Sequence, residues 1–545
     1  MFIILFLLSL FSADPRQHDA HAPAAAKPAV VTPGLGKLHH PIATRNAEAQ
    51  QFFDQGLTLV YAFNHDEAVR AFRRAAELDS SSPMPHWGIA LALGPNINLD
   101  VDPAREKAAY DEVQRAHALA ATAPPNERAY VDALVTRYAN DPQADLKALA
   151  VQYKDAMRDL IRQYPNDLDA ATLYAESLMD LHPWLLWSAD GKPAEGTEEI
   201  VAALESVLRR DSTHIGANHY YIHAVEASRT PGRALASTKR LETLVPAAGH
   251  LVHMPAHIYM RTGNYNGAVT SNAKAAEVDR AFIKANGAEG VYPSMYYNHN
   301  LDFLASAAMM SGQFQEAKQA ADLVVANVAP MLGEMPMLEP FGAKTLYVAL
   351  RFAKWNDVLA LPLPDPKHGL LTAVLHFGRG VAHAALAHVA EAEQDRAAYV
   401  VARRAIAPDT DWGYNKAKDM LAVTDAVLDA WIARAKRDEA ACIDAWRTAV
   451  LAEDMLNYNE PPDWFYPTRE SLGMTLLRVK QFDRAEQVFR EDLTRNPKNA
   501  RSLYGLWQTL LATKKPSEKD AVTAAERQFR EAWKHADVSL RLEDF

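Results

Sequence analysis

Apolar and polar residues follow one another along most of this chain with the period of an α-helix. From Ala47 onward, long runs rich in Ala, Leu, Glu, Lys and Arg place their apolar positions three and four residues apart. Segments rich in Pro and Gly interrupt these runs at residues 94–104, 182–196, 361–369 and 456–467. The pattern predicts an all-helical chain whose helices are joined by short connections and a few longer insertions.

Small and aromatic residues recur at fixed spacings within these runs. One segment places such residues at Gly56, Ala68, Phe72 and Ala75. A later segment reproduces the spacing at Gly473, Ala485, Phe489 and Pro497. Both segments resemble the tetratricopeptide repeat, a helix pair with a period of about 34 residues. Looser pairs of the same kind are expected around Ala175, Ile222, Ala256, Ala305, Leu346, Gly380 and Ala430.

The resemblance to tetratricopeptide proteins covers nearly all of residues 46–545. It implies an all-α fold, a right-handed superhelical solenoid of tetratricopeptide-like helix pairs. The segments FNHDEAVRAF, HWGIALALGPN and HMPAHIYMRTGNY look like parts of a group of exported bacterial repeat proteins to which no activity is attached. A repeat fold by itself implies only a scaffold, because such arrays host many functions.

The N-terminal residues differ from the rest of the chain. Residues 1–22 begin with the apolar run MFIILFLLSLFSA, which is typical of a signal peptide or an N-terminal anchor and is too short to span a bilayer. We therefore expect an exported protein, periplasmic or secreted, with no other transmembrane span. Residues 23–45 are rich in Pro, Ala and His and are predicted to form a disordered spacer.

Composition excludes several classes of function. The net charge of −11 is spread over 545 residues, and no basic stripe suitable for binding nucleic acid is present. Cys442 is the only cysteine, so an intramolecular disulfide, a zinc finger and an iron–sulfur site are excluded. The sequence also lacks the GxSxG, phosphate-loop and HExxH motifs.

Residues 214–302 hold an unusual concentration of histidine at helical spacings. The first of three groups is His219, His223 and Glu226, at i, i+4 and i+7. The second is His250, His253 and His257, and the third is His299 and Asp302. In tetratricopeptide proteins, the second, fifth, ninth and twelfth positions of each repeat usually face a ligand in the concave groove. These eight residues occupy such positions, which is far more histidine than 20 in 545 residues would place there by chance.

This residue set predicts a metal site in the groove. Neutral imidazoles with one or two carboxylates, and no thiolate, suit a divalent first-row metal such as Fe, Cu, Zn, Ni or Mn. The set exceeds what one tetrahedral ion needs, which leaves an octahedral ion, a pair of ions, or histidines that orient other ligands. Glu176 could supply a further carboxylate. The alternative is that the histidines only form hydrogen bonds with the backbone and buried tyrosines.

One detail of the site stays open at this point. Pro255 would break a helix interior, so His250 lies either on the same helix or in a preceding loop. Histidines outside the cluster are interpreted as packing or surface residues; these are His65, His86, His117, His182, His376, His383 and His388.

Three functions fit the sequence. The first is a metalloenzyme, oxidative or hydrolytic, acting on a small or peptidic substrate. The second is a scaffold that binds a peptide, protein or small-molecule ligand in its groove. The third is metal storage or delivery.

Overall fold

The computed structural model describes residues 29–288, 290, 292–513 and 519–545. The predicted signal peptide or anchor at residues 1–22 lies outside these residues, as do residues 23–28 of the predicted spacer. No helix in the described part of the chain has the length and apolar character that crossing a membrane requires.

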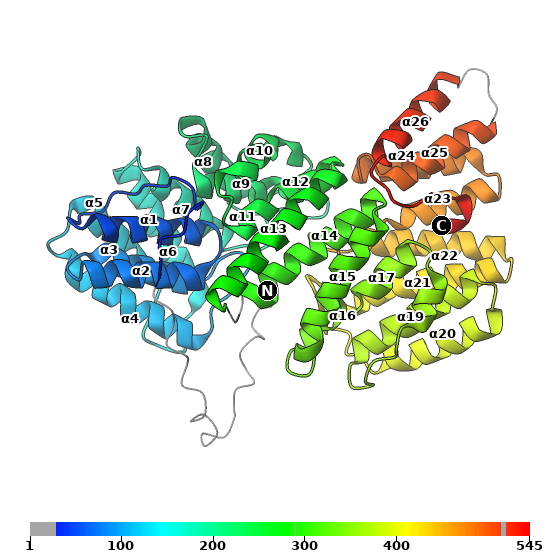
Figure 1. The fold of residues 1–545 in the computed structure, drawn as a ribbon, viewed down its shortest axis with the longest axis horizontal. Coiled ribbons are helices and arrows are strands. Elements are labelled where there is room, and N and C mark those ends of the chain that lie inside the picture. The colour runs from blue at the N-terminus through cyan, green and yellow to red at the C-terminus, as the bar shows by residue number, and fades with distance from the viewer. Residues whose placement is uncertain (1–28, 289, 291, 514–518) are drawn as a thin grey trace. The chain divides into compact units, whose positions relative to one another are not determined.

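The prediction of an all-α helical-repeat fold is confirmed. Helices form nearly all regular structure in the described residues (Figure 1). The one sheet there joins two-residue strands, β1 (Asp411–Trp412) and β2 (Asn415–Lys416). Two compact units make up the chain. Unit 1 comprises residues up to 258 and residues 277–293, and unit 2 comprises residues 259–276 and 294–545.

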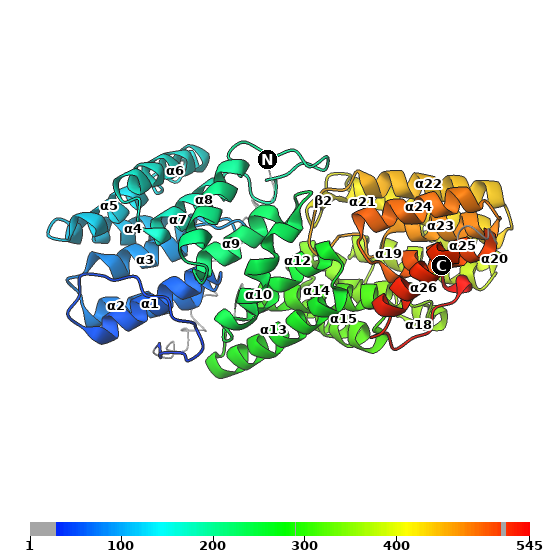
Figure 2. The same cartoon turned by 90° about the horizontal axis from the view of Figure 1, so that it is seen from above.

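Unit 1 is built from consecutive helix pairs, of which α7 and α8 can be followed in Figure 2. Its helices are α1 (Ala47–Tyr61), α2 (His65–Leu78), α3 (Pro83–Leu93), α4 (Pro103–Ala120), α5 (Pro125–Val135), α6 (Leu146–Gln163), α7 (Leu168–Met179), α8 (Thr197–Arg210), α9 (Ile215–Glu226), η2 (Pro231–Ala234), α10 (Leu235–Leu244) and α11 (Gly249–His253). The boundaries between the units fall within three further helices, α12 (Pro255–Thr262), α13 (Tyr265–Asn286) and η3 (Tyr292–Tyr297).

Unit 2 continues the same arrangement, with α19 beside α20 and α21 beside α22 (Figure 1). Its helices are α14 (Asn298–Ser311), α15 (Phe314–Val328), η4 (Ala329–Met331), η5 (Pro336–Leu338), α16 (Glu339–Gly342), α17 (Lys344–Arg351), α18 (Trp355–Ala360), α19 (Gly369–Ala385), α20 (Val389–Arg404), α21 (Ala417–Ala435), α22 (Glu439–Asp454), α23 (Thr468–Arg478), α24 (Phe482–Arg495), α25 (Ala500–Thr513), α26 (Lys519–Ala532) and η7 (Leu542–Asp544).

The repeat spacing works through glycines that face a buried phenylalanine. The Phe72 ring lies between Gly56 and Gly88, where an added Cβ would come within 2.6 and 2.5 Å of the ring. Phe489 lies in the same way between Gly473 and Gly505. Only glycine lets the first helices of two successive pairs approach one aromatic ring from both sides.

Residues 29–45 pack along α1, which differs from the disorder expected for the spacer. Thr32 N donates to Gln55 at 2.8 Å, Ile42 N donates to Gln50 at 2.9 Å, and His40 Nδ1 lies 2.8 Å from Asp169 Oδ2. Backbone groups of this segment thus find partners on α1, and the His40 side chain finds one on α7. These hydrogen bonds offset the conformational entropy that the segment loses when it becomes ordered. Its composition alone had suggested that this loss would not be offset.

Candidate metal centre

Helix α9 carries the first group of candidate ligands. His214 caps the helix by accepting a hydrogen bond from Ala217 N at 3.1 Å on Nδ1, which satisfies one of the open backbone donors. His219, His223 and Glu226 then follow on one face. Their exposed fractions are 0, 5 and 2 %. The face expected to line an open groove is therefore buried.

Helices α11 and α12 carry the second group. Pro255 is the first residue of α12, and the chain between the two helices is reduced to Met254. His250 and His253 lie on α11 and His257 lies on α12. His250 is thus helical, and the proline divides the predicted helix instead of placing His250 in a loop.

The five imidazoles of these helices form a closed ring. Starting from His219, the centroids of successive rings are separated by 4.9 Å to His250, 5.6 Å to His253, 4.7 Å to His257, 5.2 Å to His223 and 4.9 Å back to His219. All five residues belong to unit 1.

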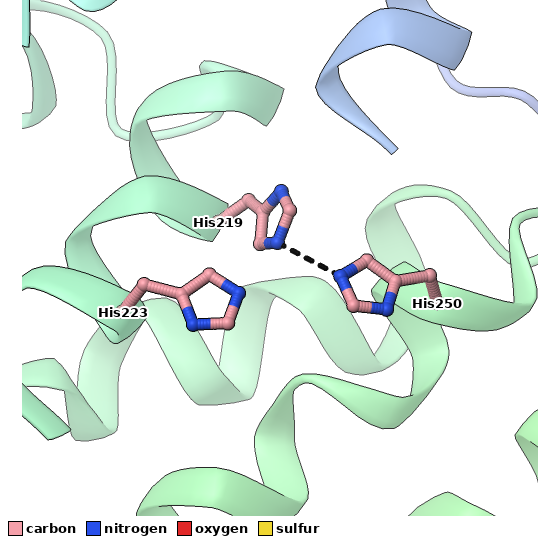
Figure 3. Close-up of side chains that lie close together, drawn as sticks. All are labelled: His219, His223 and His250. Carbon is pink, nitrogen blue, oxygen red and sulfur yellow. Dashed lines mark hydrogen bonds between the residues drawn. The ribbon is translucent and has the colours of Figure 1, made fainter. Parts of the chain in front are cut away.

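The Nε2 atoms of the ring point toward one another. His219 Nε2 and His250 Nε2 are 3.1 Å apart, and His253 Nε2 and His257 Nε2 are 2.8 Å apart. Figure 3 shows that the His223 ring points toward the His219–His250 pair. Ligand atoms of these three residues lie within 4.8 Å of one another. No hydrogen-bond partner for His223 Nε2 is found among the described residues, although this atom is buried.

The Nδ1 atoms of three of the histidines face oxygen acceptors. His219 Nδ1 lies 2.7 Å from the carbonyl oxygen of Tyr61. His223 Nδ1 and His257 Nδ1 lie 2.7 and 2.5 Å from the two carboxylate oxygens of Glu226. A carbonyl and an ionised carboxylate can only accept, so each of these Nδ1 atoms carries the proton. In the neutral ring, Nε2 then keeps its lone pair and faces inward.

Burial and the neighbouring imidazoles set the charges of the cluster. Burial lowers the pKa of His219 well below its usual range, and the His223 charge lowers it further. Burial also lowers the pKa of His223, partly offset by Glu226. Burial alone would raise the pKa of Glu226, but His257 and His223 hold it far below the ordinary value. Neutral His219 and His223 beside an ionised Glu226 are therefore favoured at pH 7.

Two aromatic side chains that the sequence analysis missed cover the ring of imidazoles. Phe63 stacks on His250 with centroids 5.3 Å apart and meets His219 edge-on at 4.5 Å. Trp184, in the insertion after α7, meets His223 edge-on at 5.7 Å. A signal for Phe63 existed in the sequence, because it occupies the turn between paired helices where Gly263 and Gly312 stand in other repeats.

The remaining predicted ligands are carried by other helices. His299 and Asp302 are on α14 in unit 2, where Asp302 forms an ion pair with Lys344 at 2.7 Å. Glu176, the further candidate, is buried on α7. Burial raises its pKa, and its charged neighbours are Arg137 and Asp180.

Histidines outside the cluster have structural partners. His86 Nδ1 lies 2.7 Å from Glu112 and His376 Nδ1 lies 2.9 Å from Asp395. Burial lowers the pKa of His65 to about 3. Their interpretation as packing residues is consistent with these surroundings.

Comparison with known proteins does not identify a family for this chain. No protein-family model and no curated protein matches the chain. The crystal structure of the APC/C hetero-tetramer Cut9–Hcn1 is similar over 90% of this chain and 78% of its own, with a TM-score of 0.30 and 14% identity. That of yeast Tom70 is similar over 89% of this chain and 93% of its own, with a TM-score of 0.30 and 10% identity. The fold assignment accordingly rests on the helix pairs of the chain itself.

Proposed function

We propose that unit 1 binds a divalent first-row transition metal within its ring of imidazoles. The observation that carries the proposal is the buried Nε2 of His223, aimed at two other imidazoles and without a hydrogen-bond partner among the described residues. An unsatisfied buried polar atom costs about 1–3 kcal/mol, which a purely structural network would avoid. A metal ion would use this lone pair.

The distances between the nitrogens support the same proposal. Metal–nitrogen bonds of about 2.0–2.1 Å place neighbouring ligands about 3.3 Å apart around a tetrahedral ion and about 2.9 Å apart around an octahedral one. The Nε2 pairs, 3.1 and 2.8 Å apart, match these edges. The Nδ1 bonds to Tyr61 and Glu226 are those that commonly orient metal-binding histidines. In an exported protein, such a centre could catalyse an oxidative or hydrolytic reaction. It could also store metal.

Elemental analysis tests the proposal. Untagged protein, loaded with each of Fe, Cu, Zn, Ni and Mn and then dialysed, should retain at least one of them in stoichiometric amount. The His223→Asn/His257→Asn variant should retain none, with unchanged helicity. The matched control is His86→Asn/His376→Asn, which removes two carboxylate-bonded histidines outside the ring. Full occupancy in the first variant, or no metal in the wild type, contradicts the proposal.

A pocket in unit 2 supports a second proposed function, the binding of an extended peptide. The first helices of successive pairs line a pocket there, with Arg351 on α17, Phe377 on α19, Trp431 on α21 and Arg501 on α25. The chain's own segment Asp544–Phe545 enters this pocket. Arg501 donates to the Asp544 carbonyl at 2.5 Å, and its guanidinium lies 4.1 Å from the centroid of the Phe545 ring. We propose that a partner peptide with an aromatic residue takes the same place, its ring against the Arg501 guanidinium and the preceding backbone carbonyl accepting from Arg501.

Competition with the chain's own segment tests this second function. A labelled peptide of residues 538–545 should bind the full-length Phe545→Ala variant more tightly than the wild type, because the internal competitor is weakened. The control peptide carries alanine in place of phenylalanine. Equal binding of both peptides to both proteins would argue against a peptide site in unit 2.

A further inference from the structure

Glu226 links imidazoles from two different helices. Its Oε1 lies 2.7 Å from Nδ1 of His223, three residues earlier on α9, and its Oε2 lies 2.5 Å from Nδ1 of His257 on α12. The carboxylate is 2 % exposed, so water is largely excluded from it. One buried carboxylate therefore contacts histidines from both helices that it links, α9 and α12.

Both contacts fix the position of a proton. Because the ionised carboxylate has no proton to donate, His223 and His257 must each donate from Nδ1. The Nε2 lone pairs of both rings then point away from Glu226. On His257 this lone pair faces Nε2 of His253 at 2.8 Å, and on His223 it faces the His219–His250 pair.

We propose that Glu226 is a positioning residue of the metal centre and not one of its ligands. It sets the tautomers of His223 and His257, so that both present Nε2 to the ion. The inference rests on the proposed function and departs from the sequence expectation that Glu226 coordinates the metal directly. A metal bound to either carboxylate oxygen would compete with an Nδ1 hydrogen bond that already aligns a ligand.

The substitution Glu226→Gln separates the two roles because it keeps the size of the side chain. The amide oxygen accepts from one Nδ1–H as before. The amide nitrogen is a donor, so the second histidine must turn its Nδ1 into an acceptor and move its proton to Nε2. One of the two inward lone pairs is thereby lost, while both hydrogen bonds remain.

The expected result is a selective loss of metal affinity. The dissociation constant of the loaded metal should rise about 10- to 100-fold, the range seen when groups that orient ligands are removed. Nitrogen NMR of the metal-free, ¹⁵N-histidine-labelled full chain should show Nδ1–H on both His223 and His257 in the wild type. In Glu226→Gln, one of the two should carry Nε2–H instead. A merely structural role would not move this tautomer signal.

Glu112→Gln is the matched control, since Glu112 bonds Nδ1 of His86 at 2.7 Å in the same unit but outside the ring. It should change the His86 signal and leave metal affinity intact. Unchanged affinity in Glu226→Gln, or Nε2–H on either histidine in the metal-free wild type, would overturn the inference. If the wild type binds no metal, the proposed function fails, and the NMR measurement still decides what Glu226 does to the two tautomers. The wild-type spectrum also decides this if the variant does not fold.

Discussion

Phe63 holds a backbone conformation that is costly for a large side chain. Its φ of 55° is left-handed, as at the corresponding turns before α18 and α24, where Ala353 and Lys480 stand. Such a conformation costs a residue other than glycine about 1–2 kcal/mol. The Phe63 ring is nevertheless buried against His219 and His250. Because the same conformation recurs at the other two turns, it belongs to the repeat, and what distinguishes Phe63 is its ring, which packs against the histidines.

Substituting glycine at this turn separates the cost of the backbone strain from the contribution of the Phe63 ring. Phe63→Gly relieves the backbone strain but removes the ring that covers the histidines, and we expect a loss of about 2–4 kcal/mol in unfolding free energy. Ala353→Gly relieves the same strain without opening a comparable cavity and should change stability by less than about 1 kcal/mol. Chemical denaturation measures both. Equal effects would mean that the Phe63 ring contributes nothing to the packing of the site.

Acid should destabilise the metal-free protein through the buried histidines. Burial lowers the pKa of His219 and His223 in the folded state, so the unfolded state binds protons more readily. Their stabilising contribution is present above the unfolded pKa of about 6.5 and is lost as the pH falls below it. Denaturation midpoints from pH 8 to pH 5 should decline more steeply in the wild type than in His219→Gln/His223→Gln. Parallel profiles would exclude these histidines as the cause.

At the scale of helices, the contact between α1 and α9 builds much of the site. Gly216 on α9 lies against the ring of Tyr61, where an added Cβ would come within 2.5 Å of a ring atom. This close approach brings the Tyr61 carbonyl to His219 and lets Phe63, two residues later, cover the imidazoles. A glycine that looks unremarkable in the sequence therefore sets how closely α1 approaches the imidazoles on α9.

Gly216→Ala should disturb the histidine cluster indirectly, although Gly216 is not part of it. The added methyl group pushes α1 away from α9, and we expect a loss of about 1–3 kcal/mol in stability together with weaker metal binding. Gly333→Ala is the control, because no atom lies within 4 Å of the position its Cβ would take. Denaturation and metal titration of both variants measure the effect. Unchanged metal affinity in Gly216→Ala would show that the α1 contact does not position His219.

The sequence predicts the local part of this arrangement and misses the distant part. His219, His223 and Glu226 share a face because residues three and four apart are neighbours on any helix. The repeat spacing also identifies the helix pairs, since Gly56 and Phe72 meet through a local packing rule. Tyr61 and Trp184 could not be placed in the same way. Tyr61 reaches His219 through a contact between non-consecutive repeats, and Trp184 reaches His223 from an insertion. The periodicity within one repeat carries no information about either contact.

At the scale of the whole chain, the two units should respond differently to metal. Contacts in a repeat array run mainly between neighbours, so stabilisation is expected to remain local. Metal at about 100 times its dissociation constant stabilises the folded site by about 2.7 kcal/mol. Hydrogen exchange should slow in residues 47–61 and 215–257 and stay unchanged in residues 369–513. Uniform protection of all three segments would contradict a site confined to unit 1.

The burial of the five imidazoles has a consequence for how fast the proposed ion would be exchanged. His219, His253 and His257 are each 0 % exposed, so an ion can enter or leave only when the helices around them separate. Loaded protein should then release its metal to a chelator at a rate that becomes independent of chelator concentration. That limiting rate reports the opening of the helices and not the strength of the metal–nitrogen bonds. The proposed ion would then stay bound for as long as the helices around it remain closed.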